Sequence, residues 1–245
     1  MVPAAEKVKR LALLFYIVPL HLLKGQLAGP GSWNIIQLKL AKTETVSFFG
    51  EAQLRSLQFY KNFHYYEYKA GIQVKILPEL SASFGAGNYQ TYREGGNFRL
   101  PKNNNELRIW PQLVFSYPMG IRLKMEHRYR AEFRFAENFY RNRFRYRLGA
   151  SIALGKKEKG KKPLVLAVGN ELFFTDRPPY FERNRAQVTL QFKATENTAI
   201  QLGYLYQFDY KINDETGRNF FQVGYYIDIN KGRSPIIESG KREEM

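Results

Sequence analysis

Residues 125–135 alternate charged side chains with apolar and aromatic ones. The charged side chains occupy every second position, at Glu126, Arg128, Arg130, Glu132 and Arg134, and Met125, Tyr129, Phe133 and Phe135 lie between them. Because successive side chains of a β-strand point to opposite faces, this pattern predicts a strand with one ionic and one apolar face. A second strand of this kind is predicted to follow, with arginines at four alternate positions, Arg141, Arg143, Arg145 and Arg147.

The alternation recurs along most of the chain. Eleven segments show it, at residues 33–40, 45–58, 63–77, 79–92, 104–117, 120–135, 140–155, 163–175, 180–194, 198–211 and 218–229. Most of them exceed the roughly 9–11 residues that a tilted membrane strand needs. We therefore expect an all-β fold, an antiparallel transmembrane β-barrel. Because bacterial single-chain barrels have even strand numbers, about twelve strands are expected, with ten as the alternative.

The connections between these segments differ in character. Those near Thr43, Pro78 and Glu196 are tight, whereas those at 93–104 and 176–180 are longer and more polar. Short turns on one rim and longer loops on the other are typical of outer-membrane barrels.

The N-terminus has the pattern of an export signal. Lys7, Lys9 and Arg10 precede an apolar run at 11–23, and Gly25 offers a small residue for cleavage. The run is too short to span a bilayer as a helix. We expect residues 1–25 to be a cleaved signal peptide, 26–230 to form the barrel, and 231–245 to be a flexible charged tail. A buried N-terminal helix is the alternative for the first segment.

Composition adds a strongly basic charge to this picture. The 245 residues carry a net charge of +16, include 17 Tyr and 19 Phe, and contain no Cys. The missing cysteines exclude disulfides and a thiol nucleophile. A charge this positive points to nucleic acid, anionic lipid or an acidic ligand. Nucleic acid is disfavoured, because the strict alternation puts arginines and aromatic rings on opposite faces, where they cannot bind one strand together.

Several motifs resemble one known family. They are Gly31-Ser32-Trp33, Glu126-His127-Arg128-Tyr129-Arg130-Ala131-Glu132, Tyr140-Arg141-Asn142-Arg143-Phe144-Arg145-Tyr146, Asn170-Glu171-Leu172-Phe173-Phe174, and Leu202-Gly203-Tyr204-Leu205-Tyr206-Gln207. Over residues 31–230 the chain resembles an uncharacterised family of Bacteroidota outer-membrane barrels, domain of unknown function 2490. The resemblance implies an exported barrel in the outer membrane of a Gram-negative bacterium and implies no reaction. The chain departs from the usual barrel ending, since fifteen residues follow Asn230.

The ionic face is the candidate functional site. If the strands face as expected, one charged set points into the lumen: Glu51, Arg55, Glu67, Lys69, Glu106, Arg108, Glu126, Arg128, Arg130, Glu132, Arg134, Arg141, Arg143, Arg145, Arg147, Glu171, Arg183 and Arg185. Arg and Glu on neighbouring strands favour a lumen filled by salt bridges, which makes the barrel rigid. Arginine outnumbers carboxylate in this set, which favours an anion-selective passage or an acidic-ligand site.

These two interpretations give different functions. The more concrete one is a narrow passage or binding site for small anionic solutes. The other is a structural or envelope-assembly barrel that transports nothing. We expect a monomer whose partners are outer-membrane lipid, the barrel-assembly machinery and a small anionic solute.

A lipid-modifying enzyme is the third hypothesis. After removal of the signal, His64 and His127 are the remaining histidines, and His127 falls on the outward parity. No Ser lies two residues from His127, and the chain has no Gly-x-Ser-x-Gly elbow. Tyrosines are the expected neighbours of His127. We therefore predict no catalytic residue, no cofactor and no metal site.

Aromatic residues near the segment ends favour belts at the two membrane interfaces. The set expected on the outer wall is Trp33, Tyr60, Tyr65, Tyr66, Tyr140, Tyr180, Tyr210 and Phe221.

Overall fold

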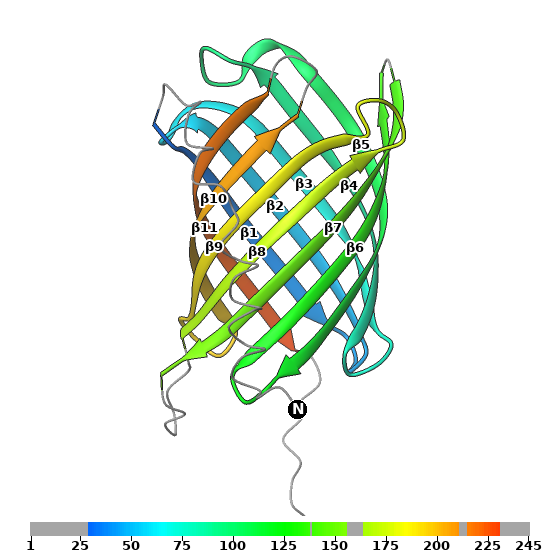
Figure 1. Cartoon of the computed structure of the whole chain (residues 1–245), viewed down its shortest axis with the longest axis vertical. Coiled ribbons are helices and arrows are strands. Elements are labelled where there is room, and N and C mark those ends of the chain that lie inside the picture. The colour runs from blue at the N-terminus through cyan, green and yellow to red at the C-terminus, as the bar shows by residue number, and fades with distance from the viewer. Residues whose placement is uncertain (1–28, 138, 156–163, 211–214, 231–245) are drawn as a thin grey trace, which may run out of the picture.

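The computed structural model describes residues 29–137, 139–155, 164–210 and 215–230, and over these ranges the chain forms one closed β-barrel (Figure 1). Its strands are β1 (Gly31–Ala41), β2 (Val46–Gln58), β3 (Lys61–Lys75), β4 (Leu80–Arg93), β5 (Arg99–Met119), β6 (Leu123–Ala136), β7 (Phe139–Leu154), β8 (Leu164–Thr175), β9 (Phe181–Lys193), β10 (Thr198–Asp209) and β11 (Thr216–Asn230). No helix in these ranges is long and apolar enough to cross a membrane.

The strands correspond one for one to the eleven segments that alternate in the sequence. Most boundaries differ by one to three residues. The largest difference is at β5, which begins at Arg99 because its hairpin with β4 continues through two irregularities, where Tyr92 pairs with Lys102 and Arg93 with Arg99.

The expectation of twelve or ten strands is wrong for the described chain, which has eleven. Each hairpin reverses the chain direction, so with an odd number the first and last strands run the same way. β1 and β11 therefore pair in parallel, from Gly31 opposite Phe220 to Ala41 opposite Asn230. All other neighbours are antiparallel. The parallel seam leaves no unpaired strand edge.

The hairpins divide between two rims. The upper rim is the end of the barrel at the top of Figure 1, and it carries the β2–β3, β4–β5, β6–β7, β8–β9 and β10–β11 connections. The lower rim carries the other connections. Its turns are tight near Thr43, Pro78 and Glu196, as expected, and close with backbone hydrogen bonds such as Ile76 N to Leu80 O at 2.9 Å. The β2–β3 connection on the upper rim is shorter than these turns, so loop length does not separate the rims strictly.

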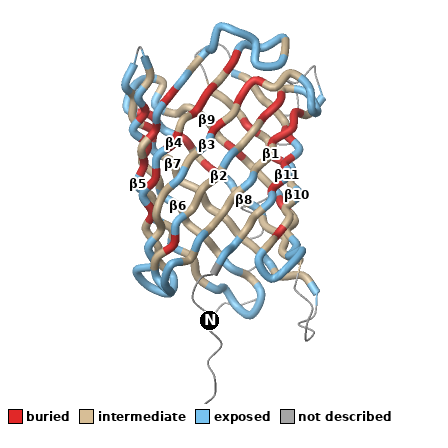
Figure 2. Tube along the Cα trace, turned by 180° about the vertical axis from the view of Figure 1, so that it is seen from behind, coloured by how far each residue is buried: buried red, intermediate tan, exposed pale blue. Residues whose placement is uncertain are grey.

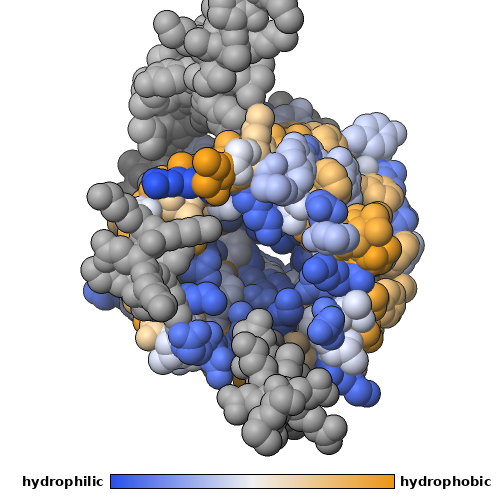
Figure 3. Space-filling view, turned by 90° about the horizontal axis from the view of Figure 1, so that it is seen from below, coloured by the Kyte–Doolittle hydropathy of each residue, from blue (hydrophilic) through white to orange (hydrophobic). Residues whose placement is uncertain are grey.

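The two faces of the sheet differ as the alternation predicts. Large apolar side chains are exposed on the outer wall, among them Ile36, Phe84, Leu113, Phe144 and Leu202. Hydrophilic side chains surround a hollow when the barrel is viewed from below (Figure 3). Buried residues concentrate in the upper half of the barrel (Figure 2), where long charged and aromatic side chains fill the interior.

The predicted signal peptide (1–25) and charged tail (231–245) lie outside the described residues, and both stay predictions.

Candidate functional site

A polar cavity of about 860 Å³ runs inside the barrel. Its wall includes Lys39 and Gln73 near the lower rim and Asn103 and Arg218 near the upper rim. In the lower half, the wall includes uncharged polar side chains such as Gln37, Ser83 and Gln191. In the upper half, arginines, carboxylates and aromatic rings line it.

Fifteen of the eighteen charged residues in the candidate set line this cavity. They are Glu51, Arg55, Glu67, Lys69, Arg108, Glu126, Arg128, Arg130, Arg134, Arg143, Arg145, Arg147, Glu171, Arg183 and Arg185. Glu106 and Glu132 are buried behind arginines of that wall. Arg141 lies near the upper rim, where its Nη2 donates to Thr175 Oγ1 at 3.1 Å and to the carbonyl oxygen of Arg177.

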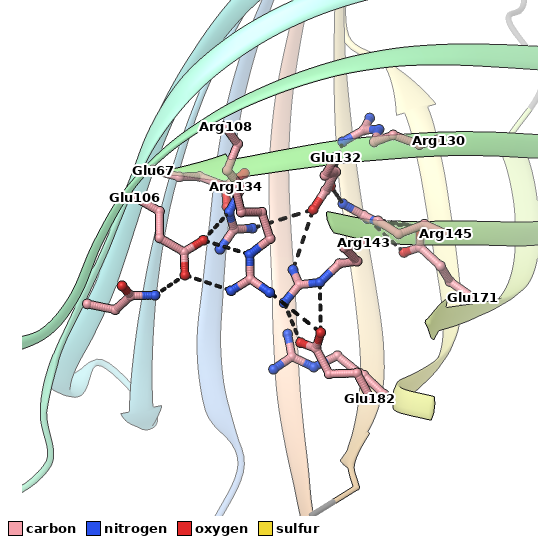
Figure 4. Close-up of polar contacts among 12 residues, drawn as sticks. Glu67, Glu106, Arg108, Arg130, Glu132, Arg134, Arg143, Arg145, Glu171 and Glu182 are labelled. Atoms are coloured by element: carbon pink, nitrogen blue, oxygen red, sulfur yellow. Dashed lines mark hydrogen bonds and ion pairs between the residues drawn. The ribbon is translucent and has the colours of Figure 1, made fainter. Parts of the chain in front are cut away.

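Glu106 is the first of four carboxylates that organise the upper half (Figure 4). Its side chain is fully buried and accepts hydrogen bonds from Arg108 Nε at 2.6 Å and from Arg134 Nε at 2.8 Å. Arg134 Nη2 donates to its other oxygen at 2.6 Å, and Asn104 also donates to that oxygen. Two-pronged contacts of this kind satisfy the donors of a buried guanidinium.

Glu132 lies at the centre of the arginine cluster. Arg145 Nη1 is 2.5 Å from its Oε1, and Arg143 Nη1 is 3.4 Å from its Oε2. Arg130 and Arg108 lie farther away, at 3.7 and 3.8 Å. One fully buried carboxylate thus faces four guanidinium groups.

Glu171 and Glu182 extend this arrangement around the lumen. Arg145 donates to both oxygens of Glu171 at 3.0 Å, and Arg128 Nη2 donates to it at 2.7 Å. Arg143 donates to both oxygens of Glu182, and Arg134 Nη1 is 3.5 Å from it. Because Arg134, Arg143 and Arg145 each contact two carboxylates, they join all four into one charged network, drawn in Figure 4.

A smaller ionic group lies on β2 and β3. Glu67 is 3.2 Å from Arg55 Nη2 and 2.7 Å from Lys69 Nζ, and Lys69 also contacts Glu51 at 2.6 Å. Tyr65 donates its hydroxyl to Glu67. Glu67 and Lys69 can pair because residues two apart share a face of the strand, whereas the other two pairs join β2 to β3.

Aromatic rings inside the lumen support the arginines. The guanidinium carbon of Arg55 lies 3.4 Å from the Trp33 ring centre and 4.1 Å from that of Tyr65. Arg108 stacks on Tyr89 at 3.9 Å. Such cation–π contacts stabilise a guanidinium away from water, so the aromatic residues restrict where the charges can move.

Three residues of the expected outer aromatic set are inside instead. Trp33, Tyr65 and Tyr210 all line the cavity, and the first two are almost fully buried. Trp33 and Tyr65 have the same parity as lumen residues, and they hold arginines rather than meeting lipid. Tyr60, Tyr140, Tyr180 and Phe221 are exposed, and Tyr66 bonds to Gln90 at 2.7 Å.

Two lumen residues escape the two-residue period because each is the extra residue of a β-bulge. Phe173 pairs with Arg183 but Phe174 pairs with Phe181, which leaves Glu182 unmatched. Likewise Arg55 pairs with Tyr65 but Ser56 with Phe63, which leaves His64 unmatched. Bulges break the alternation of faces. Asp209, which contacts Arg183, also lines the lumen but follows the alternation. It lies two residues after Gln207 on the same face of β10, so the sequence pattern could have identified it as a lumen residue.

The lumen wall carries more positive than negative charge. Thirteen Lys and Arg side chains line the cavity against seven Asp and Glu, and Glu106 and Glu132 raise the carboxylates to nine. The surplus is therefore cationic even after every buried carboxylate is counted.

His127 lies on the outer side of β6. Its Nδ1 is 2.9 Å from the Tyr146 hydroxyl, and its ring stacks on that of Tyr117 at 6.0 Å. Tyrosines are thus its neighbours, as expected. Within the described ranges, no group of three or more His, Asp or Glu side chains is arranged to hold a metal ion.

Comparison with known proteins identifies a family. The family described as "Protein of unknown function (DUF2490)" matches residues 30–218. Neither the search of curated proteins nor the search of solved structures found a match. The matched region begins just before β1, ends in β11 and includes every carboxylate of the charged network. The chain therefore belongs to the DUF2490 family, and its members are proteins of unknown function.

Proposed function

We propose that this protein is an outer-membrane β-barrel that provides a narrow passage for small anionic solutes. The observation that carries the proposal is the cavity itself. It has lining residues near both rims, from Lys39 at one end to Arg218 at the other, and a surplus of cations on its wall. Rings of Arg and Lys select anions in pores.

Membrane insertion is supported by the outer wall. Strands of 11 to 21 residues are long enough to cross a bilayer with tilt, and their outward side chains are largely apolar. Phe84, Leu107 and Leu113 are each about half exposed, which water disfavours and lipid does not. The predicted export signal agrees with this location. The proposed partners are outer-membrane lipid and the barrel-assembly machinery, and the proposed state is a monomer.

The charged network gives the passage its selectivity in this proposal. Fixed arginines of the upper half attract anions, and the paired carboxylates hold those arginines apart. Four arginines gather around Glu132 in the upper half, and we expect these long side chains to let only small solutes pass.

The same network also favours the second candidate, a barrel that transports nothing. Glu106 and Glu132 are fully buried by their arginines, and a lumen closed by such pairs conducts little. A flux measurement separates the two functions.

The test is solute entry into liposomes that contain the refolded protein. Salts of small organic acids should enter faster than neutral sugars of similar size. Replacing Arg128 and Arg143 by Gln should reduce this preference, because both guanidinium groups line the cavity. Lys193→Gln removes one positive charge from the exposed end of β9 and should leave the preference unchanged. A folded protein that admits neither class of solute would favour the structural barrel.

A further inference from the structure

Arg185 is held inside the lumen, and no carboxylate of the described residues is paired with it. It projects from β9, is only 9% exposed, and its Nε donates to the neutral amide oxygen of Gln207 at 2.8 Å. Its guanidinium carbon lies 4.8 Å from the Phe173 ring centre and 4.9 Å from that of Trp33. Among the described residues, no carboxylate forms an ion pair with it.

The surroundings of Arg185 are cationic. Arg183, Arg55 and Arg145 disfavour its positive charge, and the carboxylate of Glu171 favours it. Each of these three arginines has an anion, since Arg183 contacts Asp209, Arg55 contacts Glu67, and Arg145 contacts Glu171. Glu171 is in turn shared with Arg128.

Arg55 approaches the same tryptophan. Its guanidinium carbon is 3.4 Å from the Trp33 ring centre, and that of Arg185 is 4.9 Å from the same ring centre. The two guanidinium carbons are therefore no farther apart than the sum of these distances. The Nε of Arg55 is buried and has no hydrogen-bond partner in the described part of the chain. Two guanidinium groups therefore lie around one indole: that of Arg55 already donates to Glu67 at 3.2 Å, whereas that of Arg185 has only the Gln207 amide as a hydrogen-bond partner among the described residues.

An unpaired cation in a buried position is costly unless something neutralises it. Ring stacking offsets part of that cost, but it occupies the flat face of the guanidinium. The N–H groups point outward in the plane and remain available. A planar fork of this kind matches the oxygens of a phosphate or carboxylate.

We propose that Arg185 and Arg55, positioned by Trp33 and Phe173, form a binding site for a small oxyanion of the phosphate or carboxylate class. All four residues line the cavity, so the site is reached through the lumen. The inference rests on the proposed anion-accepting lumen and names where in that lumen the anion stops. The bound oxyanion supplies the negative charge that Arg185 lacks.

The test is a titration of the refolded protein in detergent with inorganic phosphate, followed by calorimetry. The wild-type protein should bind phosphate saturably, and Arg185→Gln should weaken binding at least about tenfold, because a charge-assisted contact is lost. Arg185→Lys keeps the charge without the planar fork and should fall between them. Lys193→Gln lowers the net charge equally from the same strand and should bind as the wild type does.

Trp33 provides a second readout that needs no change at Arg185. The chain has two Trp residues, so Trp110→Phe leaves Trp33 as the only indole, and its fluorescence should change along the phosphate binding curve. Phosphate binding without solute flux would contradict the passage and keep this site. Anion flux with no phosphate binding would overturn the site. An equal loss of phosphate affinity in Arg185→Gln and Lys193→Gln would also overturn it.

Discussion

Arg134 binds Glu106 across the β5–β6 pair through two parallel hydrogen bonds, Nε to Oε2 at 2.8 Å and Nη2 to Oε1 at 2.6 Å. Arg108 donates to the same carboxylate from two residues along β5. The Glu106 side chain is fully buried, so its negative charge is compensated by these arginines rather than by water. Glu106 in turn compensates their positive charges. The pair shows how the lumen accommodates many of its ions: buried carboxylates are shared among arginines from the same strand and from other strands.

Replacing Glu106 by Gln should destabilise the barrel strongly. The substitution leaves Arg108 and Arg134 buried with one anion fewer, and breaking a buried pair in this way costs about 3–5 kcal/mol. Urea unfolding of the refolded protein, followed by tryptophan fluorescence, measures the change.

Glu94→Gln is the matched control for that substitution. Glu94 also pairs with an arginine, Arg218, but its side chain is 60% exposed, so the loss should stay below about 1 kcal/mol. Equal losses in the two variants would show that burial of Glu106 adds nothing to its pairing.

Adding a methyl group at Gly85 should destabilise the barrel. A Cβ built there falls 2.1 Å from the nearest carbon of the Trp110 ring, so the indole must move, at a cost of about 1–3 kcal/mol. Gly50→Ala places its Cβ in open space and should be nearly neutral. Thermal unfolding of both variants measures the difference.

Trp110→Leu should remove the cost of Gly85→Ala, because the clashing atoms belong to the six-membered ring. The two substitutions should therefore be non-additive. An unchanged cost in the Trp110→Leu background would place the strain elsewhere.

An arginine on the outer wall should destabilise the protein in lipid. Leu113 is 48% exposed between the rims, and Leu113→Arg should cost about 2–4 kcal/mol if it lies near the bilayer midplane. Leu100, in the hairpin at the upper rim, is 70% exposed, and Leu100→Arg should cost less than about 1 kcal/mol. Guanidinium unfolding from vesicles supplies both values, and a harmless Leu113→Arg would argue against membrane insertion.

The alternation of side chains predicts most of this barrel. Arg128 and Tyr129, or Arg145 and Tyr146, are neighbours in sequence with opposite environments, and a period of two places each of them correctly. Hairpin order also follows, because successive strands pair with one another. The closing pair does not follow, since nothing local in Trp33 or Gln222 shows that their strands meet in parallel. The eleven alternating segments indicate eleven strands, which is correct. The expectation of twelve or ten came from the even strand numbers of bacterial single-chain barrels and is wrong here.

The sequence predicts which charged residues line the lumen better than it predicts which of them contact one another. Glu182 was missed because a bulge moves it out of the alternation, although it pairs with Arg143 and Arg134. Trp33 and Tyr65 were misplaced because aromatic side chains were assigned to the membrane despite their inward parity. The need to stack buried guanidinium groups on rings explains their position, and it depends on contacts between strands that the sequence does not specify.

The most direct test of the anion passage is the reversal potential of the refolded protein in a planar bilayer under a KCl gradient. We predict discrete conductance steps and a reversal potential that favours chloride over potassium, with the preference reduced in Arg128→Gln and Arg143→Gln. A folded barrel that gives no conductance, or one that prefers potassium, would contradict the proposed function.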